Sequence, residues 1–402
     1  MIIAGGGPSG TTLGYELSRR DVRTLLLEKA LFPRYKTCAG GIPIKVTKLI
    51  PIDISPVIET TVHDLVFTYK LGAEFMRHSE EPLVYTVERS RFDSLLLEKA
   101  REQGLEVFEE HTVKDIEQGD GWAMAVTDCG NYKAKVLVGA DGANGPVARS
   151  LGLIKETRID IGLQSEIGVR TKDLARFGSK IHIDWGTIPS GYGWVFPKKD
   201  HLSVGIGGPA ALGTRLQSYL KSFTEHKGLD STAVNQTRGH KLPTRRPGAP
   251  IVKERVMLVG DSAGLVDPFT GEGIFYAIKS AQLAADTISR ALSSGNIPDQ
   301  LVEYEEAVDN VLMPELMAAQ TLMEVANCFP RLIHRLIRDD DRFWRVFYRI
   351  VRGERAYTDV IRKLGRLGWV WSVLDTTGTS IERRRISRLK TIPKQGQILR
   401  EK

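Results

Sequence analysis

Short apolar runs separated by glycine-bearing turns open the chain and predict alternating strands and helices. Met1–Ala4 reads as a short buried strand, and Thr24–Glu28 as the next one. The segment between them predicts a helix from Pro8 to about Arg20, with proline in the first turn, where its missing N–H costs nothing. Strand, helix and strand together form a βαβ unit.

The pattern changes further along the chain. An amphipathic helix is expected from Arg91 to Gln103, and strands at 64–69, 83–87, 105–109, 122–127 and 132–139. Residues 160–240 alternate between apolar and polar in the manner of antiparallel strands, with turn signals such as Pro189-Ser190-Gly191. A strand at 255–259 then leads into a long helix from about Gly273, and the remainder is mostly helical.

The composition is that of a folded protein with two or three domains. The chain has 402 residues, of which 42% are hydrophobic and 26% charged. No apolar run approaches the ~18–20 residues of a membrane span. Because the first residues read as a buried strand, no signal peptide is expected. The three cysteines lie far apart and outside any CxxC spacing. We therefore expect a cytoplasmic protein without disulfides or a metal site.

The charge is concentrated in the tail. Residues 331–402 hold 19 Lys and Arg against 8 Asp and Glu, although the whole chain carries only +7. The body of the protein is therefore not basic, and no nucleic-acid partner is expected.

The first candidate site is Gly5-x-Gly7-x-x-Gly10, which includes Ser9 and follows the first strand. Glycines at this spacing permit a tight turn, a close approach to a pyrophosphate and close helix–strand packing. Glu28 ends the second strand, where a carboxylate can bind both hydroxyls of an adenosine ribose. An acid here favours a free 2′-hydroxyl, as in FAD or NAD, over NADP.

A second half-site lies about 250 residues later, in the segment Gly260–Ile274. Asp261 follows an apolar strand and can accept a hydrogen bond from a sugar hydroxyl. The glycines that follow, Gly271 and Gly273, open a helix whose bare N–H groups can face a phosphate or an electron-rich ring. Two half-sites so far apart predict one long cofactor bound at both ends.

Two further motifs accompany these half-sites: Arg89-x-x-Phe92-Asp93 opens a helix, and Gly139-Ala140-Asp141-Gly142 ends a strand. Over roughly residues 1–300 the set resembles the FAD-dependent family that includes p-hydroxybenzoate hydroxylase, and within it the geranylgeranyl reductases. The resemblance implies that Glu28 binds the adenosine ribose and Asp261 the ribityl chain. It also implies that Arg89 lies along the cofactor, Val113 beside the adenine, and Gly271, Gly273 and Ile274 at the flavin. From the residues alone, the alternative is that Arg89 forms a surface salt bridge with Asp93.

Details of the motifs distinguish the subfamilies. Aromatic hydroxylases usually carry His and Asn at the positions held here by Gly264 and Ile274. Cys38-Ala39-Gly40-Gly41 is similar to the cysteine–glycine loop of the reductases, which implies that Cys38, Ala39 and Gly41 lie near the flavin. Pro189-x-x-Tyr192-x-Trp194-x-Phe196-Pro197 resembles their PxxYxWxFP motif. Its period-2 spacing places three aromatic rings on one face of a strand, which is either a core face or the wall of a pocket for a prenyl chain.

These features predict an α/β protein with four segments. A Rossmann-like FAD-binding domain is expected in residues 1–155, with excursions at 42–90, and in residues 251–295. An inserted antiparallel β-sheet substrate domain is expected at 156–250, and a helical basic region at 296–402.

The resemblance implies an FAD-dependent reductase that saturates isolated C=C bonds of a geranylgeranyl or other prenyl chain, with NADPH or ferredoxin as the external reductant. The substrate would be a prenyl diphosphate, a prenylated lipid or a prenylated pigment. Cys38, Tyr192 and Trp194 are the candidate catalytic residues, and Tyr192, Trp194 and Phe196 the candidate pocket. The alternatives are a monooxygenase or halogenase of the same superfamily and a non-enzymatic flavoprotein electron carrier.

The basic tail has a pattern of its own. Its arginines recur at alternating spacings of four and three, which places Arg331, Arg335, Arg338, Arg342, Arg345, Arg349 and Arg352 on one helical stripe with an apolar face opposite. Asp340 would fall within that apolar face, so a break into two helices is expected there. Such a segment suits peripheral contact with an anionic membrane or, equally, a helix that caps a domain.

Overall fold

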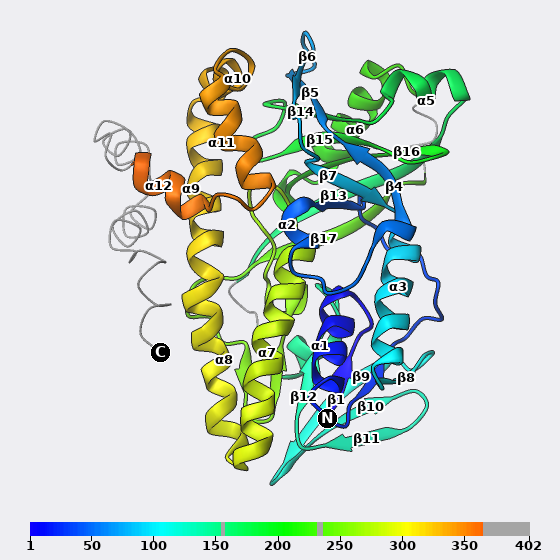
Figure 1. Cartoon of the computed structure of the whole chain (residues 1–402), viewed down its shortest axis with the longest axis vertical. Coiled ribbons are helices and arrows are strands. Elements are labelled where there is room, and N and C mark those ends of the chain that lie inside the picture. Colours follow the sequence, from blue (N-terminus) through cyan, green and yellow to red (C-terminus); the bar gives the residue numbers. More distant parts are fainter. Residues whose placement is uncertain (154–156, 231–235, 365–402) are drawn as a thin grey trace.

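The computed structural model describes residues 1–153, 157–230 and 236–364 and contains two large sheets joined by long helices (Figure 1). Residues 365–402 of the basic helical region expected at 296–402 lie outside the described residues. The first sheet is parallel except at its β18 edge, and its order is β18 (Val252–Lys253), β19 (Val256–Leu258), β12 (Leu137–Gly139), β1 (Ile2–Ala4), β2 (Leu25–Leu27), β8 (Glu106–Phe108).

Register in this sheet brings distant segments together. Ala4 pairs with Leu27 on one side and with Gly139 on the other, and Gly139 pairs with Leu258. Because the carboxyl ends of parallel strands meet at one edge, the loops after all four strands converge there.

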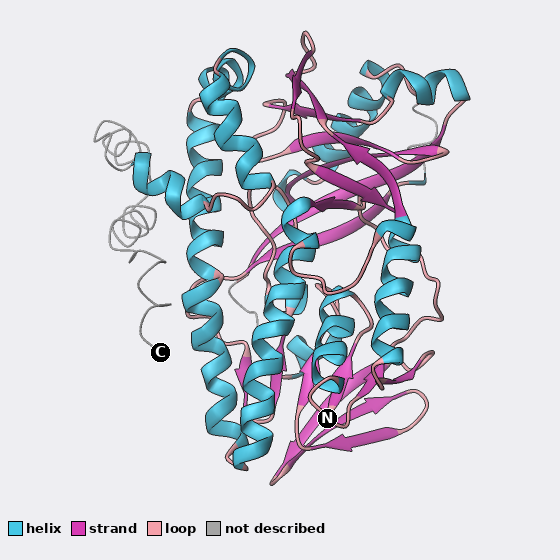
Figure 2. Ribbon diagram, in the orientation of Figure 1, coloured by secondary structure: helices cyan, strands magenta, loops and turns pink. Residues whose placement is uncertain are grey.

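Four long helices and a small sheet complete this half of the molecule (Figure 2). Its buried apolar side chains form one hydrophobic core. The helices are α1 (Pro8–Ser18), α3 (Arg89–Glu102), α7 (Ile274–Ser294) and α8 (Ile297–Val311); the small sheet contains β9 (Val113–Gly119), β10 (Trp122–Thr127) and β11 (Asn131–Ala134). The run 132–139, expected as one strand, forms parts of β11 and β12, because its two ends pair in different sheets.

The second large sheet has the order β17 (Arg238–Thr244), β13 (Arg158–Gly168), β16 (His201–Pro209), β15 (Tyr192–Pro197), β14 (Lys180–Trp185), β5 (Asp64–Tyr69), β6 (Phe75–His78). Figure 1 shows the blue β5 and β6 extending the green strands. The sheet is antiparallel except that β14 and β5 run parallel, since no hairpin connects these two strands. The 42–90 excursion thus supplies two strands of this sheet.

Shorter elements complete the fold. They are β3 (Gly41–Pro43), α2 (Ile44–Thr47), β4 (Ile58–Val62), β7 (Val84–Val87), α4 (Pro146–Ser150), α5 (Thr171–Phe177) and α6 (Thr214–His226). Of these, α4 packs in the core of the first sheet, against β9. Strands β3, β7 and β4 form a separate three-stranded sheet.

The C-terminal helices are α9 (Met313–Cys328), α10 (Pro330–Asp339), α11 (Asp341–Val351) and α12 (Tyr357–Leu364). The predicted break at Asp340 is confirmed, because its carboxylate accepts hydrogen bonds from the backbone N–H groups of Arg342 and Phe343 and caps α11. Trp344 fastens α11 to the second sheet by donating from Nε1 to the carbonyl of His78 at 2.7 Å. None of the helices described is long and apolar enough to cross a bilayer.

Candidate active site

A cavity of about 1160 Å³ begins at the converging strand ends and continues between the second large sheet and the C-terminal helices. Except for Gly10, every predicted cofactor, catalytic and pocket residue lines it. Gly10 lies in the first turn of α1, and a Cβ there would be 1.9 Å from the carbonyl oxygen of Gly5. Gly5 itself has φ +107°, and its Cβ would be 2.4 Å from the carbonyl oxygen of Ala140. The glycine pattern is therefore enforced by close backbone contacts, and it leaves room for a pyrophosphate.

Glu28 lies buried at the end of β2. Its Oε2 accepts a hydrogen bond from the N–H of Gly6 at 2.6 Å, and its Oε1 accepts one from Ala30 at 3.1 Å. These bonds fix the carboxylate while lone pairs remain for two ribose hydroxyls. Val113 lines the same end of the cavity. The strand ends thus fit the adenosine end of FAD.

Arg89 both faces the cavity and pairs with Asp93. It lines the cavity, and its Nε and Nη2 donate to the two carboxylate oxygens of Asp93 at 2.8 and 2.9 Å. This ion pair is buried and not at the surface, with 8% of the Arg89 side chain and 0% of Asp93 exposed. Burial opposes the charge of Arg89, but Asp93 raises its pKa above the ordinary value. Arg34 adds a second cation 3.2 Å from Asp93.

Asp261 lies on the turn after β19, near two basic side chains that the sequence did not single out. His240 Nε2 is 3.3 Å from its Oδ2, and Lys36 Nζ is 3.1 Å from His240 Nε2. Burial would raise the pKa of Asp261, but His240, Lys36 and Arg89 lower it, so the group is a carboxylate. Burial and Arg89 lower the pKa of Lys36 to about 8. No local spacing could reveal this cluster, since 204 residues separate Lys36 from His240.

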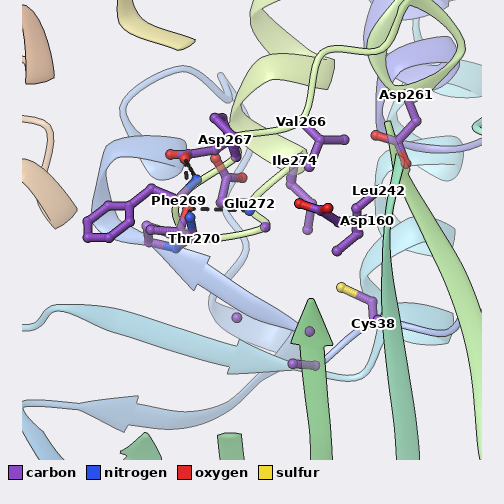
Figure 3. A pocket seen from close by; sticks show the side chains of 18 of the residues that line it. Cys38, Asp160, Leu242, Asp261, Val266, Asp267, Phe269, Thr270, Glu272 and Ile274 are labelled. Atoms are coloured by element: carbon purple, nitrogen blue, oxygen red, sulfur yellow. Dashed lines mark hydrogen bonds between the residues drawn. The ribbon is translucent and has the colours of Figure 1, made fainter. Parts of the chain in front are cut away.

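The loop before α7 is shaped by Asp267, whose Oδ1 accepts from the N–H groups of Phe269 at 2.8 Å and Thr270 at 3.2 Å (Figure 3). Its Oδ2 accepts from the hydroxyl of Tyr357 on α12 at 3.0 Å. Glu272 Oε1 caps α7 by accepting from the N–H of Phe275 at 2.6 Å. Gly271, Gly273 and Ile274 are thereby presented to the cavity at the helix start.

Cys38 lies on the other side of this part of the cavity, with its sulfur pointing toward the side where Asp160 and Leu242 lie (Figure 3). The Sγ atom accepts a hydrogen bond from the N–H of Gly40 at 3.4 Å. Asp160, a residue that the sequence did not single out, is buried in the cavity wall. Burial raises its pKa, although Arg158 at 3.0 Å opposes the shift.

Tyr192, Trp194 and Phe196 all line the cavity from β15. The Tyr192 hydroxyl donates to the carbonyl of Thr270 in the α7 loop, and burial raises its pKa above the ordinary value. Trp194 lies against Gly205, where a Cβ would be 2.3 Å from the indole ring. The stripe is therefore a pocket wall that also contacts the loop before α7.

The apolar face of α10 and α11 lines the cavity opposite the second sheet, through Leu332, Ile333, Leu336, Ile337, Phe343, Val346, Phe347, Ile350 and Val351. Arg331, Arg335, Arg338, Arg342, Arg345 and Arg349 are exposed, whereas Arg352 is half-buried. This is the arrangement expected for a helix that caps a domain. Sequence analysis identified this apolar face but not the cavity it covers.

Comparison with known proteins agrees with this geometry. Residues 1–185 match the family described as FAD binding domain. The chain is 31% identical over 308 residues to an uncharacterised protein of Methanosarcina barkeri, covering 75% of this chain and 78% of that relative. It is 26% identical over 351 residues to the digeranylgeranylglycerophospholipid reductase of Methanococcus aeolicus, covering 81% and 86%.

Two solved structures share the fold. A geranylgeranyl bacteriochlorophyll reductase-like protein of Thermoplasma acidophilum superimposes with a TM-score of 0.68 at 25% identity, over 81% of this chain and 87% of that one. A flavin-dependent brominase gives a TM-score of 0.69 at 20% identity, over 88% and 92%, which is a similarity of fold alone.

Proposed function

Because the chain belongs to the FAD-dependent oxidoreductase family that includes the geranylgeranyl reductases, we propose that it saturates isolated C=C bonds of a prenyl chain. The observation that carries this proposal is the continuity of the cavity. Residues expected at the flavin line the same space as the aromatic stripe of β15 and the apolar face of α10 and α11. A long hydrocarbon chain can thus reach the flavin without leaving apolar surroundings.

An isolated alkene has no carbonyl that a protein could polarise, so its reduction needs hydride and proton delivery in a dry site. FAD, once reduced, supplies hydride when it is bound. Glu28 would hold its adenosine ribose and Asp261 its ribityl chain, while Arg89 would lie along it. His240, Lys36 and Arg89 lower the pKa of Asp261, which keeps that carboxylate charged and able to accept hydrogen bonds.

The remaining residues would orient the chain and supply the proton. The hydroxyl proton of Tyr192 is already donated to Thr270, so Tyr192 serves as a wall and as a tether for the α7 loop. Trp194 and Phe196 extend that wall and exclude water. We assign proton delivery to the Cys38 thiol, because its sulfur faces the cavity and its Sγ accepts, and does not donate, in its bond with Gly40.

The substrate's head group and the electron donor belong to the same proposal. A prenyl diphosphate, a prenylated phospholipid and a prenylated pigment all offer the required hydrocarbon chain, and NADPH or ferredoxin would reduce the flavin. The exposed arginines of α10 and α11 support peripheral contact with an anionic lipid surface.

Mass spectrometry after anaerobic incubation with dithionite-reduced protein tests the reaction. Geranylgeranyl diphosphate, a geranylgeranylated phospholipid and a geranylgeranylated pigment would be supplied separately. We expect one of them to gain two hydrogen atoms per saturated bond. No gain in any of the three would overturn the proposal, and turnover that appears only with oxygen would favour a monooxygenase or halogenase.

A further inference from the structure

Side chains of the second sheet hold two consecutive carbonyl groups of the loop that carries Cys38. Gln164 Nε2 donates to the carbonyl oxygen of Cys38 at 3.1 Å, and Lys198 Nζ donates to that of Ala39 at 2.8 Å. Gln164 and Lys198 are only 2% and 3% exposed. Burying an ammonium group costs free energy unless hydrogen bonds and nearby charges compensate for the lost water. The contacts of Lys198 are therefore expected to have a specific role.

The same lysine closes the loop against β7. Its Nζ donates to the carbonyl oxygen of Val87 at 2.6 Å, and the Val87 N–H donates to the carbonyl of Gly40 at 2.8 Å. Gly40 has φ +68°, and a Cβ there would be 2.1 Å from the Val87 oxygen and 2.5 Å from Lys198 Nζ. The loop therefore fits between the strand and the lysine without spare room.

A row of charges behind the loop supports these two donors. Glu88 lies 3.8 Å from Lys198, and His201 Nε2 lies 3.3 Å from Glu88 and 3.4 Å from Glu166. Gln164 Nε2 also donates to Glu166 at 2.6 Å. Burial lowers the pKa of Lys198, and the two carboxylates oppose that shift. The network thus runs from the turn between β15 and β16 to the carbonyl of Cys38.

We propose that Lys198 and Gln164 are positioning residues that hold the loop carbonyls of Cys38 and Ala39 and thereby fix the Cys38 thiol in the cavity. Neither needs to touch the substrate's reacting atoms, since both act through the loop. The inference rests on the proposed place of this loop at the flavin. To the proposed function it adds how side chains of the second sheet fix the position of the Cys38 thiol.

The rate at which N-ethylmaleimide labels Cys38 tests the inference, measured by mass spectrometry on the FAD-loaded protein. Cys129 and Cys328 are exposed and would first be replaced by serine. Lys198→Met and Gln164→Met each remove one loop contact, so each is expected to raise the labelling rate by about tenfold or more.

Lys227→Met is the matched control. Lys227 is a lysine of the same half of the molecule with 3% exposure, and its Nζ pairs with Glu74 at 2.6 Å, far from the loop in sequence and in contacts. Cys38 in Lys227→Met should be labelled at the same rate as in the parent protein.

Three results would overturn the inference: an unchanged rate in folded Lys198→Met, an unchanged rate in Gln164→Met, or an equal rise in the control. If Lys198→Met does not fold, Gln164→Met decides alone. No prenyl substrate enters the labelling assay, so this failure is distinct from a failure of the proposed reaction.

Discussion

Removal of the carboxylate of Asp93 is the most direct test of how the cofactor side of the cavity is stabilised. Asp93 is fully buried on α3 and accepts hydrogen bonds from Arg89 at 2.8 and 2.9 Å and from Arg34 at 3.2 Å. In Asp93→Ala the guanidinium of Arg89 would stay buried without a counter-charge.

The expected loss can be worked out from this burial. Breaking a buried ion pair by removing one partner costs about 3–5 kcal/mol, because the remaining charge is neither paired nor hydrated. A total stability of about 5–15 kcal/mol would thus fall by a large fraction. Arg89→Met with Asp93→Leu removes both charges, so this double variant should lose less than Asp93→Ala alone.

Urea denaturation of the FAD-free protein, followed by circular dichroism, measures these losses without a contribution from cofactor affinity. Glu102→Ala is the control, because Glu102 pairs with Lys99 on the same helix but both side chains are exposed. We expect no detectable change there. A loss in Asp93→Ala as small as in this control, or a double variant less stable than Asp93→Ala, would refute the reasoning.

Three further predictions concern other parts of the chain. Glu28→Ala should weaken FAD binding by about 10–100-fold, because charge-assisted hydrogen bonds are lost. Titrating the FAD-free protein with FAD and following the flavin fluorescence measures the Kd. An unchanged Kd would contradict the prediction. Hydrogen bonds to Glu166 and Glu88 raise the pKa of His201 from 6.5 to about 10. The folded state therefore holds this proton more tightly, so the stability advantage of the parent over His201→Gln should be full below pH 6.5 and vanish as the pH rises through 10. Urea midpoints across this range measure it, and a constant advantage would count against it. Trp344→Ala should lower the free energy of unfolding by about 3–5 kcal/mol, measured by thermal denaturation, since it removes a buried ring that fastens α11. Arg342→Ala, at a site with 90% side-chain exposure, serves as its control. An equal loss in both variants would argue against this role of Trp344.

Local patterns predicted those parts of the site that depend on neighbouring residues. The glycines after β1, the acid at Glu28 and the helix break at Asp340 follow from spacing and polarity over a few positions, and the structure has the same elements there. Contacts between distant segments gave no such signal. The cluster of Lys36, His240 and Asp261 joins three segments, and Asp93 pairs with Arg34, which approaches from another loop.

The split of 132–139 into two strands has the same cause. An apolar run reports that its residues are buried, but it does not reveal that its two halves pair with different sheets. The sequence likewise could not distinguish two roles for α10 and α11, because an apolar helix face can lie on a membrane or cover a cavity.

The cover formed by α10 and α11 has a consequence for how such proteins can diverge. Every strand of the cofactor-binding sheet lies before residue 259, whereas the cover is one contiguous segment that begins at Pro330. Substitutions on its inward face can lengthen, shorten or reshape the apolar chamber while the glycine turns and the carboxylates at the strand ends stay unchanged. Under the proposed function, hydrocarbon preference could therefore change through substitutions in the cover alone, while β15 on the opposite wall and the cofactor-binding strand ends keep their sequence.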